Sequence, residues 1–271
     1  MDYQTFEPAD ELKAWIKCFW TLEFPAEVTP EKQRIVPDGC MEMIFHYGDL
    51  YRQYTSSEES IIQPKCFVIG QLTEVLEIEP TGATGIFAVR FNPEGFSPFS
   101  VLPLKELENK AVDLNILFGN RGFEIEKEVL GAKSVSERIT RIEHFLLDLL
   151  KESTVIDRIV SSTVETIATA NGRLPIGELS DQIQIHRRQL ELKFSSTIGL
   201  SPKQLSRIVR LQTVIKRLLT NDFTNLSALA HEEEYFDQAH FIKDFKEFTG
   251  LTPKEFYGND LKLSALFYGN D

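Results

Sequence analysis

The residues of this sequence that are best placed for chemistry are basic side chains in the stretch HRRQLELKF. Leu190 and Phe194 have the i, i+4 spacing of a buried helix face, so the other side chains point outward. These outward positions are Arg187, Arg188, Glu191, Leu192 and Lys193. An arginine can bind a guanine edge with two hydrogen bonds, so we expect Arg188 to contact bases and Arg187 and Lys193 to contact phosphates. Ordinary solvated charges would give the same pattern, and that alternative stays open.

Covalent and metal chemistry have little support. The sequence contains no GxSxG, GxxxxGK[ST] or GxGxxG pattern, which argues against hydrolase, P-loop and dinucleotide-binding functions. His46 is the only histidine in residues 1–130, no HxH occurs, and Cys18, Cys40 and Cys66 lack CxxC spacing. We therefore predict no enzyme, no cofactor and no metal site.

The charge of the chain is unevenly distributed. The net charge is −12, and residues 1–171 carry 16 Lys/Arg and 28 Asp/Glu. Residues 172–221 carry 9 and 3, residues 222–258 carry 3 and 8, and the tail 259–271 carries 1 and 2. Because local charge decides whether a surface attracts phosphate, the basic block at 172–221, with a charge of +6, is the expected nucleic-acid-binding region.

The composition predicts a cytoplasmic protein with no membrane partner. The chain is 42% hydrophobic and 26% charged, which is ordinary for a globular protein. No apolar run approaches the roughly 20 residues of a membrane helix, and the acidic N-terminus lacks the apolar segment of a secretory signal. Three scattered cysteines fit a reducing compartment.

Two kinds of periodicity divide the chain. Short β-rich runs bounded by Gly, Pro and Asn fill about the first 110 residues. A stripe of apolar residues predicts a helix over about 134–151, with Ser134 and Glu137 as a capping box, and we expect this stripe to face its own domain. Short helices then follow to about Phe256. The expected breaks between them are Asn171-Gly172, Gln184, Gly199, Asn221-Asp222, Glu234 and Gly250.

The helical region contains a duplicated unit. GLSPKQL, starting at Gly199, and GLTPKEF, starting at Gly250, match position for position 51 residues apart. Each Gly ends a helix, and Ser201 or Thr252 caps the next one with Pro in its first turn. At the same offset, Leu190 and Phe194 fall opposite Phe241 and Phe245, whereas Ile185 aligns best with Tyr235 if the second turn has one extra residue. Each unit therefore predicts a short helix, a tight turn and a second helix.

The duplicated pattern resembles the DNA-binding domain of the AraC/XylS family of bacterial transcription regulators. The resemblance covers roughly 172–258 and is strongest in FDQAHFIKDFKEFTGLTPKEF. It implies one monomer with two recognition helices, which enter successive major-groove segments about 34 Å apart, joined by the long helix SPKQLSRIVRLQTVIKRLL.

The resemblance also implies which residues contact DNA. The second unit's contacts are Gln238, Ala239, His240, Ile242 and Lys243. Phosphate contacts are expected at Ser201, Lys203, Arg207, Thr252 and Lys254. His240 could instead serve only to orient the turn through Asp237. We expect the acidic residues Glu232, Glu233, Glu234 and Asp237 to repel phosphate, so the first unit supplies most of the affinity.

Two departures from the family pattern stand out. Gln184 and Glu234 occupy turn positions where the family usually has Gly, so each would have to adopt a left-handed conformation at a cost of roughly 1 kcal/mol. Leu192 stands where the family often has a basic residue on the first recognition helix.

The N-terminal region resembles a domain of uncharacterised function that often precedes this DNA-binding domain. The resemblance rests on VPDGCMEMIFHYGD, GQLTE and FAVRFNPEGF and covers about 1–120. It implies a small barrel or sandwich that senses a small molecule or mediates dimerisation. Trp15, Trp20, His46 and Arg90 could line its ligand pocket, although each also fits an ordinary core position.

Together these features predict an α+β protein: a β-barrel- or sandwich-like regulatory domain followed by an all-α domain with two helix-turn-helix units. The expected boundaries are 1–152, 153–258 and a tail at 259–271, with the linking region 152–171 transmitting the signal. Partners would be double-stranded DNA, an unknown small-molecule effector, and as further candidates RNA polymerase and a second copy of the chain. The alternative is a small-molecule-binding protein whose helical domain has lost tight DNA binding; the +6 block argues against it, because such a domain would have no reason to keep that charge.

Overall fold

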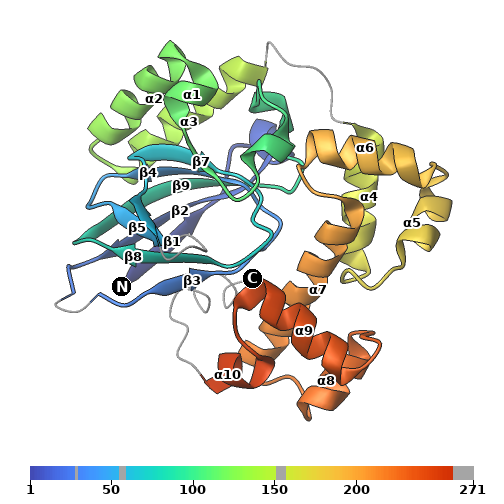
Figure 1. Cartoon of the computed structure of the whole chain (residues 1–271). Helices are drawn as coiled ribbons and strands as arrows, with labels where there is room; N and C mark the ends of the chain where they lie inside the picture. Colours follow the sequence, from blue (N-terminus) through green and yellow to red (C-terminus); the bar gives the residue numbers. More distant parts are fainter. Residues whose placement is uncertain (28–29, 55–58, 151–156, 259–271) are drawn as a thin grey trace.

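The computed structural model describes residues 1–27, 30–54, 59–150 and 157–258 and has two parts of different class (Figure 1). Antiparallel sheets with three covering helices form the N-terminal part, and helices alone form the described residues from 157 to 258. This confirms the predicted α+β class and the predicted order of the two domains. The expected tail at 259–271 and residues 152–156 of the expected link lie outside the described residues, whereas residues 158–169 of that link form a helix.

A six-stranded sheet forms the centre of the N-terminal domain. Its strand order is β1-β2-β9-β4-β7-β10, and every neighbouring pair is antiparallel. A 3-10 turn at Asp10–Leu12 precedes β2, which begins at Ile16. The strands are β1 (Asp2–Phe6), β2 (Ile16–Phe24), β9 (Thr84–Phe91), β4 (Glu42–His46), β7 (Cys66–Ile69) and β10 (Ala111–Asp113).

A second, four-stranded sheet packs against one face of the first. Its order is β3-β8-β5-β6, and the apolar cluster between the sheets takes side chains from β2 and β9 on one side and from β5 and β8 on the other. The arrangement is therefore a sandwich rather than a closed barrel. The strands are β3 (Gln33–Ile35), β8 (Leu76–Pro80), β5 (Tyr51–Tyr54) and β6 (Ser60–Ile62).

Strand β9 shows how one strand supplies two cores. All eight of its residues are buried, because it lies between β2 and β4 with a layer on each face. Phe87 and Val89 belong to the cluster shared with the helices, whereas Ile86 and Ala88 belong to the cluster between the sheets. The period of two therefore sends odd-numbered residues to the helices and even-numbered residues to the second sheet.

Three helices cover the other face of the large sheet (Figure 1). The predicted apolar stripe faces this core: Ile142 and Leu146 are fully buried in it. Ser134 accepts a hydrogen bond from the Glu137 N–H, as predicted, but the Glu137 carboxylate accepts its hydrogen bond from Lys133 N–H. The helices are α1 (Leu114–Phe118), α2 (Asn120–Gly131) and α3 (Val135–Leu150).

The helical domain breaks where the sequence predicts. Its left-handed residues are Asn171, Gly172, Gln184, Gly199, Asn221, Glu234 and Gly250. The helices between them are α4 (Arg158–Thr169), α5 (Ile176–Ile183), α6 (Arg187–Thr197), α7 (Pro202–Leu219), α8 (Leu226–Glu232), α9 (Gln238–Thr249) and α10 (Pro253–Gly258).

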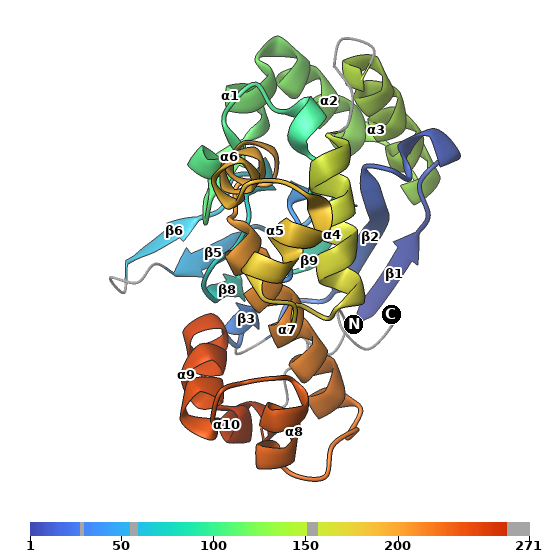
Figure 2. The same ribbon diagram turned by 90° about the vertical axis from the view of Figure 1, so that its right-hand side faces the viewer.

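Helix α7 joins two units of the same design, α5–α6 and α8–α9, which lie toward its opposite ends (Figures 1 and 2). The turns correspond as expected: Ile185 N–H donates to Ser180 O, and Tyr235 N–H donates to Ala230 O. Donors and acceptors of these two bonds are each offset by 50 residues, whereas the buried residues of the helices that follow are offset by 51. The second turn therefore does contain one extra residue, and Tyr235 is buried where its neighbour Phe236 is exposed.

Candidate nucleic-acid interface and ligand pocket

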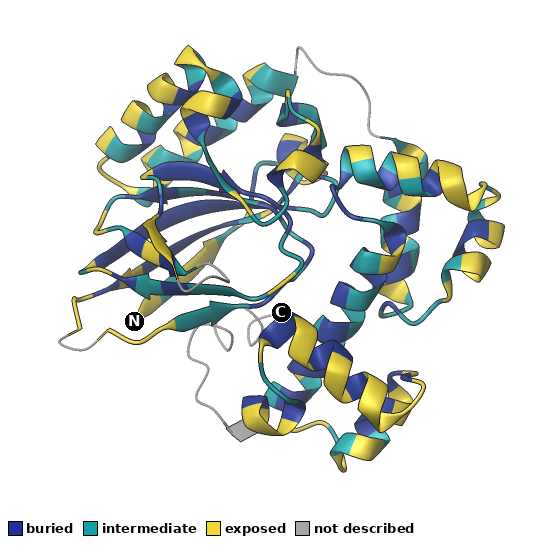
Figure 3. Cartoon of the chain, in the orientation of Figure 1, coloured by how far each residue is buried: buried dark blue, intermediate teal, exposed yellow. Residues whose placement is uncertain are grey.

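Helix α6 presents a polar face to solvent, as the sequence predicts. Figure 3 shows exposed positions beside buried ones along the helices of this domain. Leu190 and Phe194 are fully buried, whereas Arg187 and Arg188 are exposed and Leu192 is 64% exposed. The helix follows the left-handed turn at Gln184, which sets its angle to α5. Arg188 and Leu192 lie one turn apart, so they share one side of the helix.

Two of the expected cations on α6 are already paired. Arg187 Nε lies 2.9 Å from Glu191 Oε1, and Lys193 makes an ion pair with Asp157, the residue that caps α4. No ion pair joins Arg188 to any residue that the structure describes. Of the three cations, Arg188 is therefore the most available to an incoming nucleic acid.

Helix α9 presents the second unit's expected contacts. Gln238, Ala239, His240, Ile242 and Lys243 are all exposed, whereas Phe241 and Phe245 are buried. Asp237 caps the helix by accepting a hydrogen bond from His240 N–H at 2.7 Å. Asp237 thus orients the turn through the His240 backbone, and the His240 ring, packed edge-on to Tyr235, stays at the surface.

The acidic residues of the second unit are largely neutralised from α7. Arg207 donates to Asp244 Oδ1 from Nε at 2.8 Å and lies 2.9 Å from Glu247, and Arg210 lies 3.8 Å from Asp244. Arg217 binds Glu232 at 2.5 Å and Glu233 at 2.8 Å. The expected repulsion of phosphate therefore falls mainly on Glu234 and Asp237.

This network changes what the basic block means. At least five of its nine cations form ion pairs within the described residues, namely Arg187, Lys193, Arg207, Arg210 and Arg217. A domain that had lost DNA binding would still need most of these side chains for its own fold. The +6 charge is therefore a weaker argument for DNA binding than the sequence alone suggests.

The expected phosphate contacts fall into two groups. Ser201 and Thr252 cap α7 and α10, and each forms a full capping box, with Gln204 or Glu255. Lys203 and Lys254 are exposed in the first turns of these helices, 51 residues apart. Arg207 does not fit the group, because the buried carboxylate of Asp244 already holds its guanidinium.

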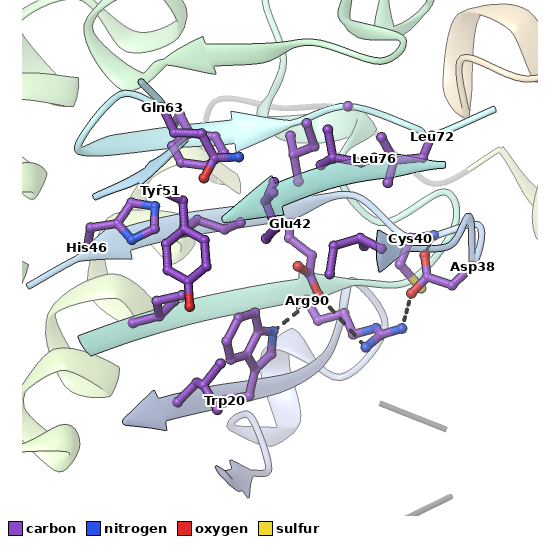
Figure 4. Close-up of a pocket in the computed structure, with 18 of the residues that line it drawn as sticks. Trp20, Asp38, Cys40, Glu42, His46, Tyr51, Gln63, Leu72, Leu76 and Arg90 are labelled. Carbon is purple, nitrogen blue, oxygen red and sulfur yellow. Dashed lines mark hydrogen bonds and ion pairs between the residues drawn. The ribbon is translucent and has the colours of Figure 1, made fainter. Parts of the chain in front are cut away.

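A pocket opens between the two sheets of the N-terminal domain (Figure 4). Its volume is about 800 Å³ when the open mouth is counted, of which about 80 Å³ admits the centre of a water molecule. Of the four candidate pocket residues, Trp20, His46 and Arg90 line it, because all three lie on even-numbered positions that face the second sheet. Trp15 does not: it precedes β2 and packs against Phe99 in the helix-side core.

The sequence reasoning missed several polar residues of this pocket. Asp38, Glu42, Tyr51 and Gln63 also line it. Glu42 could have been found, since it shares the even-numbered face of β4 with His46. Asp38 could not, because only the fold brings its turn across to Arg90 on β9.

A charged group occupies one end of the pocket, at the right of Figure 4. Arg90, whose side chain is 8% exposed, makes an ion pair with Asp38, and its Nη1 lies 3.8 Å from Glu42 Oε1. Glu42 also accepts a hydrogen bond of 3.1 Å from Trp20 Nε1. Burial raises the pKa of Glu42 to about 7, and the Trp20 hydrogen bond opposes this rise.

The turn that carries Asp38 also contacts the helical domain. Gln212 on α7 donates a hydrogen bond to Pro37 O, and Val36 belongs to the helical domain's core. Gly39 has a φ of +78°, and a Cβ there would lie 3.0 Å from Leu205 Cδ1. Residues 36–39 are therefore wedged between the pocket and α7.

None of the described helices has the length and apolar content needed to cross a bilayer. Nor do the described residues gather three or more His, Cys, Asp or Glu side chains into a group that could hold a metal ion.

The fold and the paired units define a double helix-turn-helix protein, and the family comparisons are consistent with that class. Residues 179–258 match a family described as a helix-turn-helix domain, and residues 4–113 match a domain of unknown function, DUF6597. The C-terminal region therefore carries an AraC-type helix-turn-helix domain, and a DUF6597 domain precedes it.

Among solved structures, ToxT from Vibrio cholerae is similar over 89% of this chain and 98% of its own, at 13% identity and a TM-score of 0.48. ToxT from Vibrio cholerae O395 bound to (E)-4-(8-methylnaphthalen-1-yl)but-3-enoic acid is similar over 95% and 99%, at 12% identity and a TM-score of 0.48. No curated protein matches the sequence.

Proposed function

We propose that the protein is a sequence-specific transcription regulator that reads successive major-groove segments with α6 and α9. The observation that carries this proposal is the repetition of one unit at both ends of α7, with an exposed helix face each time. Recognition helices of helix-turn-helix proteins lie in the major groove, so two on one chain can read two adjacent elements. The proposed division is a regulatory domain at 1–152, a DNA-binding domain at 153–258 and a tail at 259–271.

The first unit supplies most of the base contacts in this proposal. Arg188 is exposed and suited to bind a guanine edge, and Leu192 offers an apolar contact one turn away. Gln238, His240 and Lys243 add readout from the second unit. Ser201, Lys203, Thr252 and Lys254 contact phosphates from the starts of α7 and α10, with the two lysines as the main charge.

The N-terminal domain regulates DNA binding in this proposal through residues 36–39. Asp38 faces the pocket, whereas Val36, Pro37 and Gly39 contact the helical domain. A ligand that fills the space between the sheets therefore acts on the same turn that holds α7, and α7 carries both recognition helices. Such a ligand would favour one arrangement of the helices by binding it more tightly. This direct route complements the covalent link at 152–171.

The proposal is tested by selecting random-sequence duplexes on the full-length chain and measuring affinity for the selected site. We expect a site with two elements about one helical turn apart, and an affinity that falls with salt by about 0.9 log units per phosphate contact for each log unit of salt. Arg188→Ala should weaken binding by about 5- to 150-fold, the equivalent of about 1–3 kcal/mol. Lys243→Ala should weaken it only a few-fold.

Lys127, an exposed lysine on α2 of the N-terminal domain, provides the control: Lys127→Ala should leave DNA affinity unchanged. A large loss with Lys243→Ala and none with Arg188→Ala would reverse the assigned roles of the two units. A chain that selects no sequence at any salt would instead be a ligand-binding protein whose helical domain has lost tight DNA binding. The internal pairing of at least five of the nine cations in residues 172–221 is the observation that keeps this second candidate open.

A further inference from the structure

The pocket between the sheets has apolar walls and a different polar group at each end (Figure 4). The walls come from both sheets and include Leu22, Ile44, Phe67, Leu76, Ile78 and Ile86. Covering such walls releases about 25 cal/mol for each Å² of apolar surface removed from water, so they favour a mainly apolar occupant. The polar ends then decide which head group that occupant carries.

His46 forms the end of the pocket opposite the charged group. It is 1% exposed, and neither ring nitrogen has a hydrogen-bond partner among the described residues. Its ring lies 5.6 Å from the Tyr51 ring and 5.8 Å from the Phe67 ring, centre to centre. Leaving a buried donor or acceptor unpaired costs about 1–3 kcal/mol, so His46 is a strong candidate to meet a ligand group.

The polar neighbours of His46 make hydrogen bonds to other residues. The Tyr51 hydroxyl shares a hydrogen bond of 2.8 Å with Thr84 Oγ1, and the Gln63 amide donates to Gln53 Oε1 at 3.2 Å. Burial lowers the pKa of His46 to about 4, and the neighbouring Gln63 side chain opposes this shift although it does not meet the geometry of a hydrogen bond to either ring nitrogen. At neutral pH the ring is therefore uncharged and offers one donor and one acceptor on different edges, and a hydroxyl or a primary amide can pair with either one.

The charged end disfavours an ionic head group. Arg90 is held by the Asp38 carboxylate and also faces the carboxyl group of Glu42, so its guanidinium already has acidic partners. A ligand carboxylate would have to displace Asp38, and a ligand ammonium would compete with Arg90 for the same oxygens. Both exchanges also require the ligand's charge to leave water, which is expensive in a largely apolar space.

We propose that this pocket binds an uncharged, mainly apolar molecule whose hydroxyl or amide group hydrogen-bonds with His46. The inference rests on the proposed regulatory role of the N-terminal domain and names the chemical class of its effector. The molecule's apolar body lies between the sheets and reaches toward the Asp38–Arg90 pair.

The test uses sets of probes that share one apolar body and differ in head group. Hexyl, decyl and naphthylmethyl bodies are each offered as alcohol, primary amine and carboxylate, up to 1 mM, to the full-length chain without DNA. A Trp15→Phe background leaves Trp20 of the pocket as the fluorescent reporter. We expect at least one body whose alcohol binds about 10-fold or more tightly than its amine and carboxylate counterparts.

Substitution of His46 checks the contact itself. His46→Phe should abolish the preference for the alcohol, with His46→Leu as a second variant if the larger ring does not fit. His144→Phe, at an exposed position on α3, should leave the preference unchanged. Without ligand, His46→Leu should not lower the melting temperature, because the apolar side chain removes an unpaired buried polar group. If His46 only supported the fold, the same substitution would lower the melting temperature.

Three outcomes overturn the proposal: carboxylates or amines that bind most tightly, no binding by any probe, or a preference for alcohols that survives both His46 substitutions. None of these outcomes bears on DNA recognition, which is measured without ligand. A failure here therefore differs from a failure of the proposed function.

Discussion

The two helix-turn-helix units are alike inside and different outside. Leu190 and Phe194 in the first unit and Phe241 and Phe245 in the second are fully buried, at equivalent positions. After each unit the next helix begins with a capping box, at Ser201 in the first case and at Thr252 in the second. On the surface, α6 shows two arginines and a leucine, whereas α9 shows Gln238, His240 and Lys243 among small and apolar residues.

At one pair of equivalent positions the two units carry opposite charges that serve the same structural role. Lys193 and Asp244 lie 51 residues apart, and each ties its recognition helix to another helix of the domain. Lys193 pairs with Asp157 at the start of α4, and Asp244 pairs with Arg207 on α7. Charge at such positions serves the fold, so the charge of a unit, summed over its residues, does not measure how well its outer face binds DNA.

Breaking these two anchors gives the largest expected contrast. Asp244 is 3% exposed, so Asp244→Asn should destabilise the protein by about 2 kcal/mol, less than for a fully buried pair because Glu247 still holds Arg207. Lys193→Met should cost less than about 1 kcal/mol, because both members of its pair are partly exposed. Urea unfolding of the full-length chain, followed by circular dichroism, measures both.

Glu247→Gln is the matched control, since Glu247 is half-exposed and should cost little on its own. Equal losses for Asp244→Asn and Lys193→Met would mean that the two anchors are equivalent after all, and that the burial of Asp244 has no consequence for stability.

A smaller effect should separate the outer faces. Leu192 is exposed one turn from Arg188, where an apolar side chain can contact the methyl group of a thymine. Leu192→Ala should weaken binding to the selected site by a few-fold, and replacing that thymine with deoxyuridine should cost about the same. Because both changes remove one contact, combining them should add little, which competition binding of the four combinations can measure.

Ile242, which is 37% exposed on α9, provides the comparison. If Leu192→Ala and Ile242→Ala weaken binding equally, the first unit does not dominate recognition. If no thymine position responds to Leu192→Ala, the leucine has no role in readout.

Local features of both domains could be predicted from the sequence because they depend on neighbours along the chain. Capping by Ser201 and Thr252, the left-handed Gln184 and Glu234, and the buried i, i+4 pairs all follow from residue type and spacing. The alternation on β4 and β9 likewise places His46 and Arg90 on one face of the sheet.

Contacts between distant segments could not be predicted in this way. Arg207 was expected at phosphate, but α7 brings it beside Asp244, 37 residues later. Trp15 was expected in the pocket, but the chain turns before β2 and directs it to the helix-side core. Nothing in the local sequence indicates that residues 36–39 touch α7, since that contact exists only once both domains have folded.

The smallest expected effect concerns the turns that the two units share. Gln184 and Glu234 adopt φ values of +55° and +56°, a region that disfavours side chains with a Cβ by about 1–2 kcal/mol. Glycine avoids this strain but loses more backbone entropy on folding, so Gln184→Gly and Glu234→Gly should each stabilise the protein by less than about 1 kcal/mol. Gln182→Gly, inside α5, should destabilise it by about the same amount, because a helical residue gains nothing from glycine. Thermal unfolding of the three variants compares them directly. A loss of stability at one turn would mean that its side chain makes a contact that stabilises the protein by more than the strain costs. If only one turn behaved in this way, the turns of the two units would differ, as their outer faces do.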